Sequence, residues 1–312
     1  MIDIVVPFYN DSDKEWKKVL YECMEKENST DRQVTGEERY RDWENFKYFF
    51  RGIEENCKWV NKVFLIVASE SQIPEWLDRN NPKLRIVLHE EFIPKELLPT
   101  FNTMTIELYI SKIKDLSNNF VYCNDDYFFL NKTDAEMFFV NDLPVYVDRE
   151  CKLEKFGAYW TESSDGTFYQ VLNNGIDLQI EVSGNKAKWY AIDHLPTPHK
   201  KDFENEIIDK YYDRFIQANS KSRFRHKNNY SSHVFVCLYK DIKPYYIYNF
   251  MNSYYVTVKK DIDFNEHKNC KMICFNDTEQ LKQEDFEEVK NRMIDFLDNR
   301  FPNKSSFERK EV

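Results

Sequence analysis

The sequence predicts an α/β fold built on a mostly parallel, Rossmann-like sheet flanked by helices, with a mixed α+β C-terminal elaboration. Three apolar, β-branched runs support this prediction, at residues 2–8, 62–68 and 120–123. Such continuous runs are typical of strands that are buried on both faces of a parallel sheet. Helical patterns separate the runs, and strands that alternate with helices indicate βαβ units.

The elements between these strands follow from helical spacing and from turn residues. Asp42 is expected to cap a helix in which apolar residues recur from Trp43 to Cys57. The other elements of this part are expected in the order helix 14–26, short helix 73–77, strand 84–88 and helix 100–113.

From about Phe156 onward the pattern changes to shorter elements. The sequence predicts strands at 176–182, 188–192 and 272–275, and helices at 203–217, 232–239 and 279–299. Because no Pro/Ser-rich linker or internal repeat interrupts the chain, we expect one domain over residues 1–312. Within it, residues 1–150 form the α/β half and residues 151–312 form an α+β half that completes the same site.

The composition excludes several classes of protein. With 42% hydrophobic and 16% aromatic residues, the chain is expected to fold rather than to remain disordered. Neither G-x-G-x-x-G nor G-x-x-x-x-G-K-[ST] occurs, which excludes the corresponding dinucleotide and P-loop sites. The net charge of -10 disfavours a nucleic-acid partner, because such partners usually require a basic face.

The seven cysteines form no C-x-x-C pair, and their apolar surroundings indicate reduced thiols of a cytoplasmic protein. No segment resembles a signal peptide, and no apolar stretch approaches the roughly 20 residues of a membrane span. We therefore expect any membrane contact to be peripheral, at the inner face. A basic stretch from Lys200 to Lys227 fits an anionic ligand or membrane, or equally a solvated helix face.

The tripeptide Asn124-Asp125-Asp126 directly follows the apolar run at 120–123. Two adjacent carboxylates therefore lie at the carboxyl end of a strand, where open α/β sheets bind ligands. Asp125 and Asp126 suit a hard divalent cation, Mg²⁺ or Mn²⁺, that in turn holds phosphate oxygens. An ordinary acidic turn is the alternative. The order of strands, acidic loop and helix is typical of a nucleotide-sugar-binding, GT-A-like domain.

Four separated segments carry further motifs. They are IVVPFYNDSDKEW at 4–16; RYRD, RGIEEN, WVNKVF, QIPEWL, LPTFN and NDD between 39 and 126; HLPTPHK and SRFR between 194 and 225; and ICFND and FPNKSSFE between 273 and 308. In this order they resemble the four motif regions of the Stealth phosphotransferases. Asp13 and Trp16 match the first region, whereas Asn10 and Asp11 replace its usual aspartate and glycine.

The Stealth family includes bacterial capsular-polysaccharide hexose-1-phosphate transferases and the catalytic subunit of the animal GlcNAc-1-phosphotransferase. The resemblance implies transfer of a hexose 1-phosphate from a nucleotide sugar of the UDP-sugar type to a hydroxyl of an acceptor glycan. The product is a phosphodiester of a surface polysaccharide, and a nucleoside monophosphate is released. The acceptor is lipid-linked in one version of this hypothesis, with Lys200–Lys227 or Tyr245–Tyr255 touching the membrane.

The resemblance also assigns roles to residues. His194 is the candidate general base for the acceptor hydroxyl, because imidazole exchanges protons near neutral pH, and His199 is a second choice. Arg225, and less directly Arg223, would bind the diphosphate through bidentate contacts. Substrate-binding roles are further expected for Asn10, Asp13, Asn102, Asn276 and Asp277, and for Arg51, which has a structural ion pair as its alternative.

Two other functions remain open at this point. A metal-dependent glycosyltransferase would use the same donor and the same paired carboxylates, but it would release a nucleoside diphosphate. A catalytically inactive carbohydrate-binding module would bind sugar without needing Asp126 or His194 for turnover.

Overall fold

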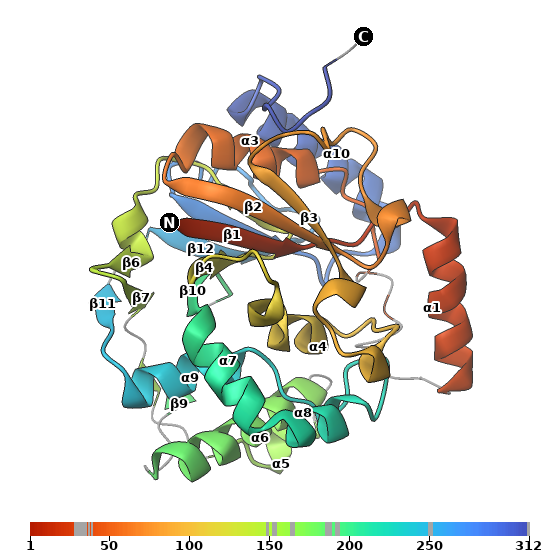
Figure 1. Ribbon diagram of the computed structural model, residues 1–312. Coiled ribbons are helices and arrows are strands. Elements are labelled where there is room, and N and C mark those ends of the chain that lie inside the picture. The colour runs from red at the N-terminus through yellow and green to blue at the C-terminus, as the bar shows by residue number, and fades with distance from the viewer. Residues whose placement is uncertain are drawn as a thin grey trace.

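A five-stranded sheet forms the centre of the computed structural model (Figure 1), which describes residues 1–27, 36, 38, 40–147, 150–151, 155–162, 166–184, 189–190, 194–248 and 252–310. The strand order is β10-β4-β1-β2-β3. Strands β1 to β4 run parallel and β10 is antiparallel to β4. Their bounds are β1 Ile2–Pro7, β2 Val60–Val67, β3 Leu84–Leu88, β4 Asn119–Tyr122 and β10 Thr197–Lys200. The prediction of an α/β fold with a mostly parallel central sheet is confirmed.

Alternation of side chains along β1 and β2 divides the core into two layers. Val5 and Phe64 belong to one apolar cluster, whereas Ile4, Val6 and Leu65 belong to another on the opposite face. Both faces are therefore buried, which explains why the strands appear in the sequence as continuous apolar runs.

Helices cover both faces of this sheet (Figure 1). On one face the core includes side chains of α4 (Thr103–Leu108), α6 (Gly166–Ser183), α7 (Lys201–Lys210), α8 (Tyr212–Asn219) and α9 (His233–Ile242). On the other face lies α3 (Phe46–Asn56). Among the described residues, the other α-helices are α1 (Lys14–Lys26) at the edge, α5 (Ala158–Thr161), and α10 (Gln283–Arg300), which lies beside α3.

Smaller sheets join distant parts of the chain. Strands β12 (Ser253–Thr257), β13 (Met272–Asn276) and β5 (Tyr127–Phe129) form one sheet, in that order, and α10 packs against it. Another contains β11 (Tyr246–Tyr248), β7 (Leu143–Val147) and β6 (Phe139–Val140), and β8 (Glu150–Cys151) pairs with β9 (Trp189–Tyr190). Because β10 pairs with β4 and β13 with β5, the C-terminal half contributes strands beside those of the N-terminal half.

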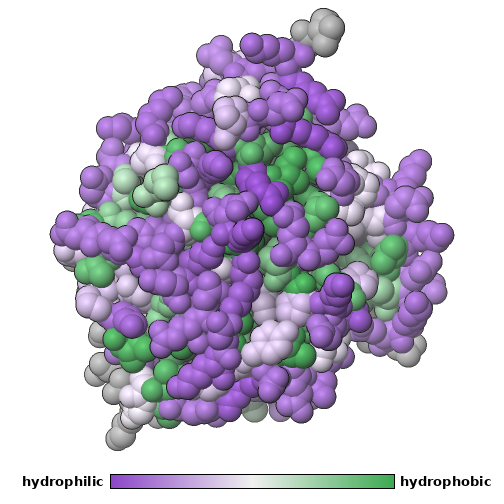
Figure 2. Space-filling view, viewed as in Figure 1, coloured by the Kyte–Doolittle hydropathy of each residue, from purple (hydrophilic) through white to green (hydrophobic). Residues whose placement is uncertain are grey.

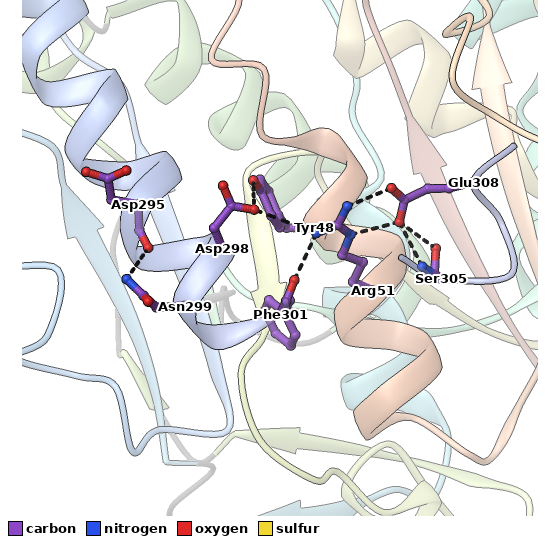
Figure 3. Close-up of polar contacts among 8 residues, drawn as sticks. All are labelled: Tyr48, Arg51, Asp295, Asp298, Asn299, Phe301, Ser305 and Glu308. Atoms are coloured by element: carbon purple, nitrogen blue, oxygen red, sulfur yellow. Dashed lines mark hydrogen bonds and ion pairs between the residues drawn. The ribbon is translucent and has the colours of Figure 1, made fainter. Parts of the chain in front are cut away.

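Helix α3 approaches β5 closely and anchors the C-terminal segment. A Cβ atom at Gly52 would lie 3.0 Å from the Phe129 carbonyl oxygen, so glycine allows this approach. Beside it, Arg51 donates from Nε and Nη2 to the two Glu308 carboxylate oxygens, each at 2.8 Å, and from Nη1 to the Phe301 carbonyl (Figure 3). The structure thus places Arg51 in the structural ion pair that was the alternative to substrate binding.

Several predicted elements in the first half are corrected by the structure. Helix α3 begins at Phe46 after Asn45, and Asp42 accepts from the Glu44 backbone N–H in a turn instead of capping the helix. Residues 73–77 form no helix, since Leu77 pairs with Glu308 in a β-bridge. The helix expected over 100–113 is shorter, because the Asn102 side chain caps α4 at its start and the helix ends at Leu108.

Corrections in the second half have the same kind of cause. Residues 176–182 lie within helix α6, because a short apolar run does not distinguish a buried helix from a strand. The helix expected over 203–217 is divided into α7 and α8 at Tyr211. Of the strand expected at 188–192, Trp189–Tyr190 forms β9, and the other positions lie outside the described residues. The expected 279–299 helix begins later, at Gln283.

The surface is predominantly hydrophilic on the face shown in Figure 2, with apolar residues in smaller groups between polar ones. None of the helices in the described part of the chain is both long enough and apolar enough to cross a membrane.

Candidate active site

A cleft of about 890 Å³ opens at the carboxyl ends of β1 and β4. Along the sheet the parallel strands run β3-β2-β1-β4, so the chain order reverses between β1 and β4. Such a switch point is where open α/β sheets form their ligand crevice. Phe8 and Tyr9 after β1, and residues 124–126 after β4, line the cleft.

Asp125 and Asp126 line this cleft at the tight connection from β4 to β5. Burial, together with the neighbouring Asp126 carboxylate, raises the pKa of Asp125 to about 7. The Oδ1 atom of Asp126 is buried and has no hydrogen-bond partner in the described structure. The two carboxylates therefore have too few hydrogen-bond donors or positive charges around them to offset their burial. This makes them suitable ligands for a cation.

His194 reaches the same point of the cleft from the segment before β10. Its Nε2 lies 3.9 Å from Asp126 Oδ2 and 3.1 Å from the Asn124 amide nitrogen. The rings of Tyr127 and Tyr255 approach the imidazole edge-on, with centroids at 5.4 and 5.3 Å. Because an amide nitrogen only donates, Nε2 is the acceptor in this contact.

Cys274 on β13 is a site residue that the sequence analysis did not identify. Its Sγ donates to Asp126 Oδ2 at 3.2 Å, and burial raises the pKa of the thiol well above its ordinary value. The backbone N–H of Phe275 also donates to the Asp126 carbonyl at 3.1 Å. Strand β13 therefore fixes both the backbone and the carboxylate of Asp126.

The two predicted arginines separate in the structure. Arg225 lines the cleft and donates from Nη2 to Thr103 Oγ1 at 2.9 Å. Arg223 instead donates to the Glu96 carbonyl at 3.0 Å and is not among the lining residues. Asn102 is fully buried and donates to the Phe224 carbonyl and to Asn229 Oδ1. Asn102 therefore holds the loop that carries Arg225, and it does not face the cleft.

Asn10 and Asp13 shape the loop after β1 and are not among the cleft-lining residues. Asn10 Oδ1 accepts from the backbone N–H and the hydroxyl of Ser12, and Asp13 caps helix α1 through the N–H groups of Glu15 and Trp16. Gln72, which lines the cleft, donates to Asp13 Oδ2 at 2.8 Å and accepts from the Asn10 backbone N–H at 2.7 Å. No pattern in the sequence indicated these contacts of Gln72.

Asn276 and Asp277, both expected to bind substrate, line the cleft at the end of β13. Arg41 donates to Asp277 Oδ1 at 3.0 Å and Trp43 Nε1 donates to Oδ2 at 3.1 Å. Burial raises the pKa of Asp277 to about 6 although both contacts favour the ionised carboxylate. Because Arg41 already occupies its oxygens, Asp277 supports the wall of the cleft, and Arg41 is a further residue not expected from the sequence.

Three other histidines line the cleft. His199, the second candidate base, is buried with Nδ1 at 2.6 Å from Glu204 Oε1 and is stacked on Phe120. Burial lowers the pKa of His89 and of His233 to about 4, so both are neutral at neutral pH. Of these four histidines, His194 is the most exposed, with 46% of its side chain accessible to solvent.

The lining is strongly acidic. Among the lining residues that the structure describes, eight are carboxylates and two are arginines. The carboxylates are Asp11, Glu38, Asp42, Glu107, Asp125, Asp126, Asp277 and Glu279, and the arginines are Arg41 and Arg225. A phosphate-bearing ligand would meet net repulsion in such a cleft unless a cation entered with it.

The basic stretch from Lys200 to Lys227 does not form one free basic face. Lys200 Nζ donates to Asn119 and Asp142, and Lys201 Nζ donates to three backbone carbonyls between residues 113 and 116. Arg214 pairs with Glu181 at 2.8 Å. These three cations hold elements together, so they do not form an open anion-binding surface.

Comparison with known proteins identifies the family. Models of Stealth conserved region 2 and conserved region 4 match residues 39–145 and 264–312. A capsular polysaccharide phosphotransferase WcwK of Streptococcus pneumoniae is 34% identical over 99% of this chain and 98% of its own length. The receptor polysaccharide phosphotransferase WefC of Streptococcus gordonii is 29% identical, over 98% of both chains.

An exopolysaccharide phosphotransferase, cps2G of Lactiplantibacillus plantarum, is 26% identical over 99% of this chain and 96% of its own. The two family models include Asp125, Asp126, Cys274 and Asp277, which meet around the cleft. The chain therefore belongs to the Stealth family and is an enzyme that transfers phosphorus-containing groups.

Proposed function

We propose that the enzyme transfers a hexose 1-phosphate from a nucleotide sugar of the UDP-sugar type to a hydroxyl of an acceptor glycan in surface polysaccharide biosynthesis. The acceptor oxygen attacks the β-phosphorus, the bond from that phosphorus to the bridging oxygen breaks, and a nucleoside monophosphate leaves. The observation that carries this proposal is the meeting of Asp126, His194 and Arg225 in one cleft at the strand switch point. The relatives named as polysaccharide phosphotransferases support the same chemistry.

The residues divide the work of phosphoryl transfer, which needs positioning, charge neutralisation and a base. His194 Nε2 takes the proton of the acceptor hydroxyl, because it accepts a hydrogen bond and is exposed to the cleft. Arg225 binds the equatorial phosphate oxygens through its guanidinium, and Thr103 orients it. The acidic turn at 124–126 carries the remaining groups.

A divalent cation, Mg²⁺ or Mn²⁺, belongs to this proposal. The unpartnered Asp126 Oδ1, the raised pKa of Asp125 and the excess of carboxylates in the lining all fit a hard cation. Asp125 and Asp126 would hold it. When bound, such an ion neutralises charge on the donor phosphates. The same features support a GT-A-like use of the sheet, in which paired carboxylates follow the last parallel strand.

The acceptor glycan is proposed to enter past β12. Tyr255 lines the cleft beside His194, and half of its surface is exposed. Exposed Tyr246, Ile247 and Tyr248 lie on β11. Aromatic rings there offer flat apolar faces to sugar rings. A lipid-linked acceptor would bring this side of a cytoplasmic enzyme to the inner face of a membrane.

The identity of the released nucleotide tests the proposed function. Purified protein is incubated with Mg²⁺ or Mn²⁺, a panel of nucleotide sugars and a glycan acceptor, and the products are separated by ion-exchange chromatography. We expect a nucleoside monophosphate and a phosphate-bearing glycan. Release of a nucleoside diphosphate would instead identify a glycosyltransferase, and sugar binding without release from any donor would favour a binding module.

Replacing His194 by alanine is expected to lower transfer by about 10²- to 10⁴-fold, the usual contribution of a general base. Donor binding should be retained, because His194 is assigned to the acceptor hydroxyl and not to the diphosphate. The measurement combines turnover with calorimetric titration of the donor. His267→Ala, an imidazole outside the cleft lining, is the control and should keep near-native turnover. If His194→Ala lost donor binding as strongly as it lost turnover, His194 would be a residue that positions the donor and not the general base.

A further inference from the structure

Three different ligand types converge beside the acidic turn. Asp126, His194 and Cys274 each offer one ligand atom, and these atoms lie within 4.8 Å of one another. The Cys274 Sγ is 3.2 Å from Asp126 Oδ2, and His194 Nε2 is 3.9 Å from the same oxygen. The three residues come from the β4–β5 connection, the segment before β10 and strand β13, so the fold itself brings them together.

These separations are close to those of a tetrahedral thiophilic metal site and would have to shorten on the side of the imidazole. With bonds of about 2.3 Å to sulfur and about 2.0 Å to nitrogen or oxygen, neighbouring ligands of zinc lie about 3.3 to 3.5 Å apart. The sulfur–oxygen pair is already near this separation. The imidazole would have to move closer to both other ligands, because its Nε2 lies 3.9 Å from the Asp126 oxygen and within 4.8 Å of the Cys274 sulfur. A set of three protein ligands with an open fourth position is the arrangement of catalytic zinc sites.

The donor set selects against hard cations. Mg²⁺ prefers oxygen ligands in octahedral geometry, whereas sulfur and imidazole favour Zn²⁺ and Co²⁺. The exposed imidazole edge of His194 gives an ion access from the cleft. The Asn124 amide, which contacts Nε2, lies in a turn at the cleft surface and is partly exposed, so it can yield this position.

We propose that Asp126, His194 and Cys274 form a three-ligand site for a thiophilic divalent cation, Zn²⁺ or its analogue Co²⁺. On binding, the S–H bond of Cys274 breaks, its proton leaves to solvent, and a metal–sulfur bond forms. The ion takes the place of the hydrogen bond from Cys274 to Asp126.

Occupation of this site has a functional consequence that rests on the proposed function. The ion would bind the lone pair of His194 Nε2, which otherwise takes the proton of the acceptor hydroxyl. It would also bind an oxygen of Asp126. Neither residue could then take part in the transfer reaction. Thiophilic cations therefore inhibit the enzyme, and they bind more tightly than Mg²⁺ because of the sulfur ligand.

The test is titration of the untagged, metal-free, full-length protein with Co²⁺, followed by absorption spectroscopy. A thiolate bound to Co²⁺ gives a charge-transfer band in the near ultraviolet, and we expect this band to saturate at one ion per chain. Cys274→Ser should lose the band, and His194→Ala should weaken Co²⁺ binding by about tenfold or more. Cys270→Ser removes another buried thiol, one that donates to the Met272 carbonyl, and should keep the band.

The outcomes separate this inference from the proposed function. Absence of the band in folded wild-type protein, or its persistence in folded Cys274→Ser, would overturn the site, even if a nucleoside monophosphate is released. A band without any donor turnover would support the site and contradict the proposed function. In an active preparation, stoichiometric Zn²⁺ should abolish Mg²⁺-supported transfer by the wild type. Cys274→Ser, compared with its own rate without Zn²⁺, should resist this inhibition.

Discussion

Replacing Asp126 by alanine is expected to lower turnover by about 10³-fold or more, because several kcal/mol of transition-state stabilisation depend on the cation that it would hold. The fold should remain intact. Asp126 Oδ1 is buried without a partner, so its desolvation opposes folding in the protein as it stands. Thermal unfolding should therefore occur at an unchanged or higher temperature. The measurement pairs turnover with thermal unfolding followed by circular dichroism.

Asp126→Asn keeps the size of the side chain and removes its charge, and it should lose activity nearly as strongly as alanine. Asp11→Asn is the matched control, because it removes one negative charge from the same cleft. The Asp11 carboxylate already pairs with Lys17 at 2.8 Å, so this change should cost less than about tenfold. Near-native activity of Asp126→Asn would contradict the assignment of Asp126 as a metal ligand. An equal loss of activity in Asp11→Asn would show that the loss reflects the overall negative charge of the cleft and not a specific metal ligand.

The position of Asp125 and Asp126 in the cleft could be predicted from the sequence, because a pair of adjacent carboxylates coincides there with the end of an apolar run. Asp125 and Asp126 follow a buried strand, and the carboxyl ends of parallel strands share one edge of the sheet. Asn102 and Asp13 carry equally polar side chains near predicted element ends, yet both cap helices. The type of side chain does not distinguish a helix cap from a residue that binds substrate, because the same side-chain oxygen can accept from a backbone N–H or contact a bound molecule. That choice depends on the backbone that tertiary packing brings near.

Cys274 was missed because a cysteine within a buried strand has the appearance of core. A signal was present, since side chains alternate along a strand and Cys274 therefore shares a face with the predicted site residue Asn276. Gln72 and Arg41 lie in the motifs QIPEWL and RYRD, but no pattern in the sequence indicated which residues they contact. Their partners, Asp13 and Asp277, are 59 and 236 positions away in the chain. Only the folded arrangement joins them.

The strands of the sheet were predictable because each apolar run satisfies two buried faces at once. Helix ends were less so. Neither Tyr109, where α4 ends, nor Tyr211, where α7 gives way to α8, is a glycine or proline. These breaks have no local signal in the sequence, and the helices end there as parts of the packed core.

Replacing Arg51 by methionine is expected to lower the free energy of unfolding by about 3–5 kcal/mol, because it leaves the Glu308 carboxylate buried without its counter-charge. Both side chains are at most 8% exposed. Burial opposes ionisation of Glu308, but hydrogen bonds from Arg51 and Ser305 hold its pKa below the ordinary value. This contribution is therefore present above the unfolded-state pKa and is lost as the pH falls through the folded-state pKa. Denaturant unfolding of wild type and variant at neutral and acidic pH measures it.

A double variant and a control variant distinguish a structural ion pair of Arg51 from a contact between Arg51 and a substrate phosphate. Arg51→Met combined with Glu308→Gln removes both charges and should recover part of the lost stability, whereas Arg79→Met breaks an exposed pair with Glu70 and should cost less than about 1 kcal/mol. The folded fraction of Arg51→Met should keep native turnover, because Arg51 does not line the cleft. A loss of turnover at unchanged stability would instead assign Arg51 a part in catalysis, although its guanidinium is bound to Glu308 and to the Phe301 carbonyl (Figure 3).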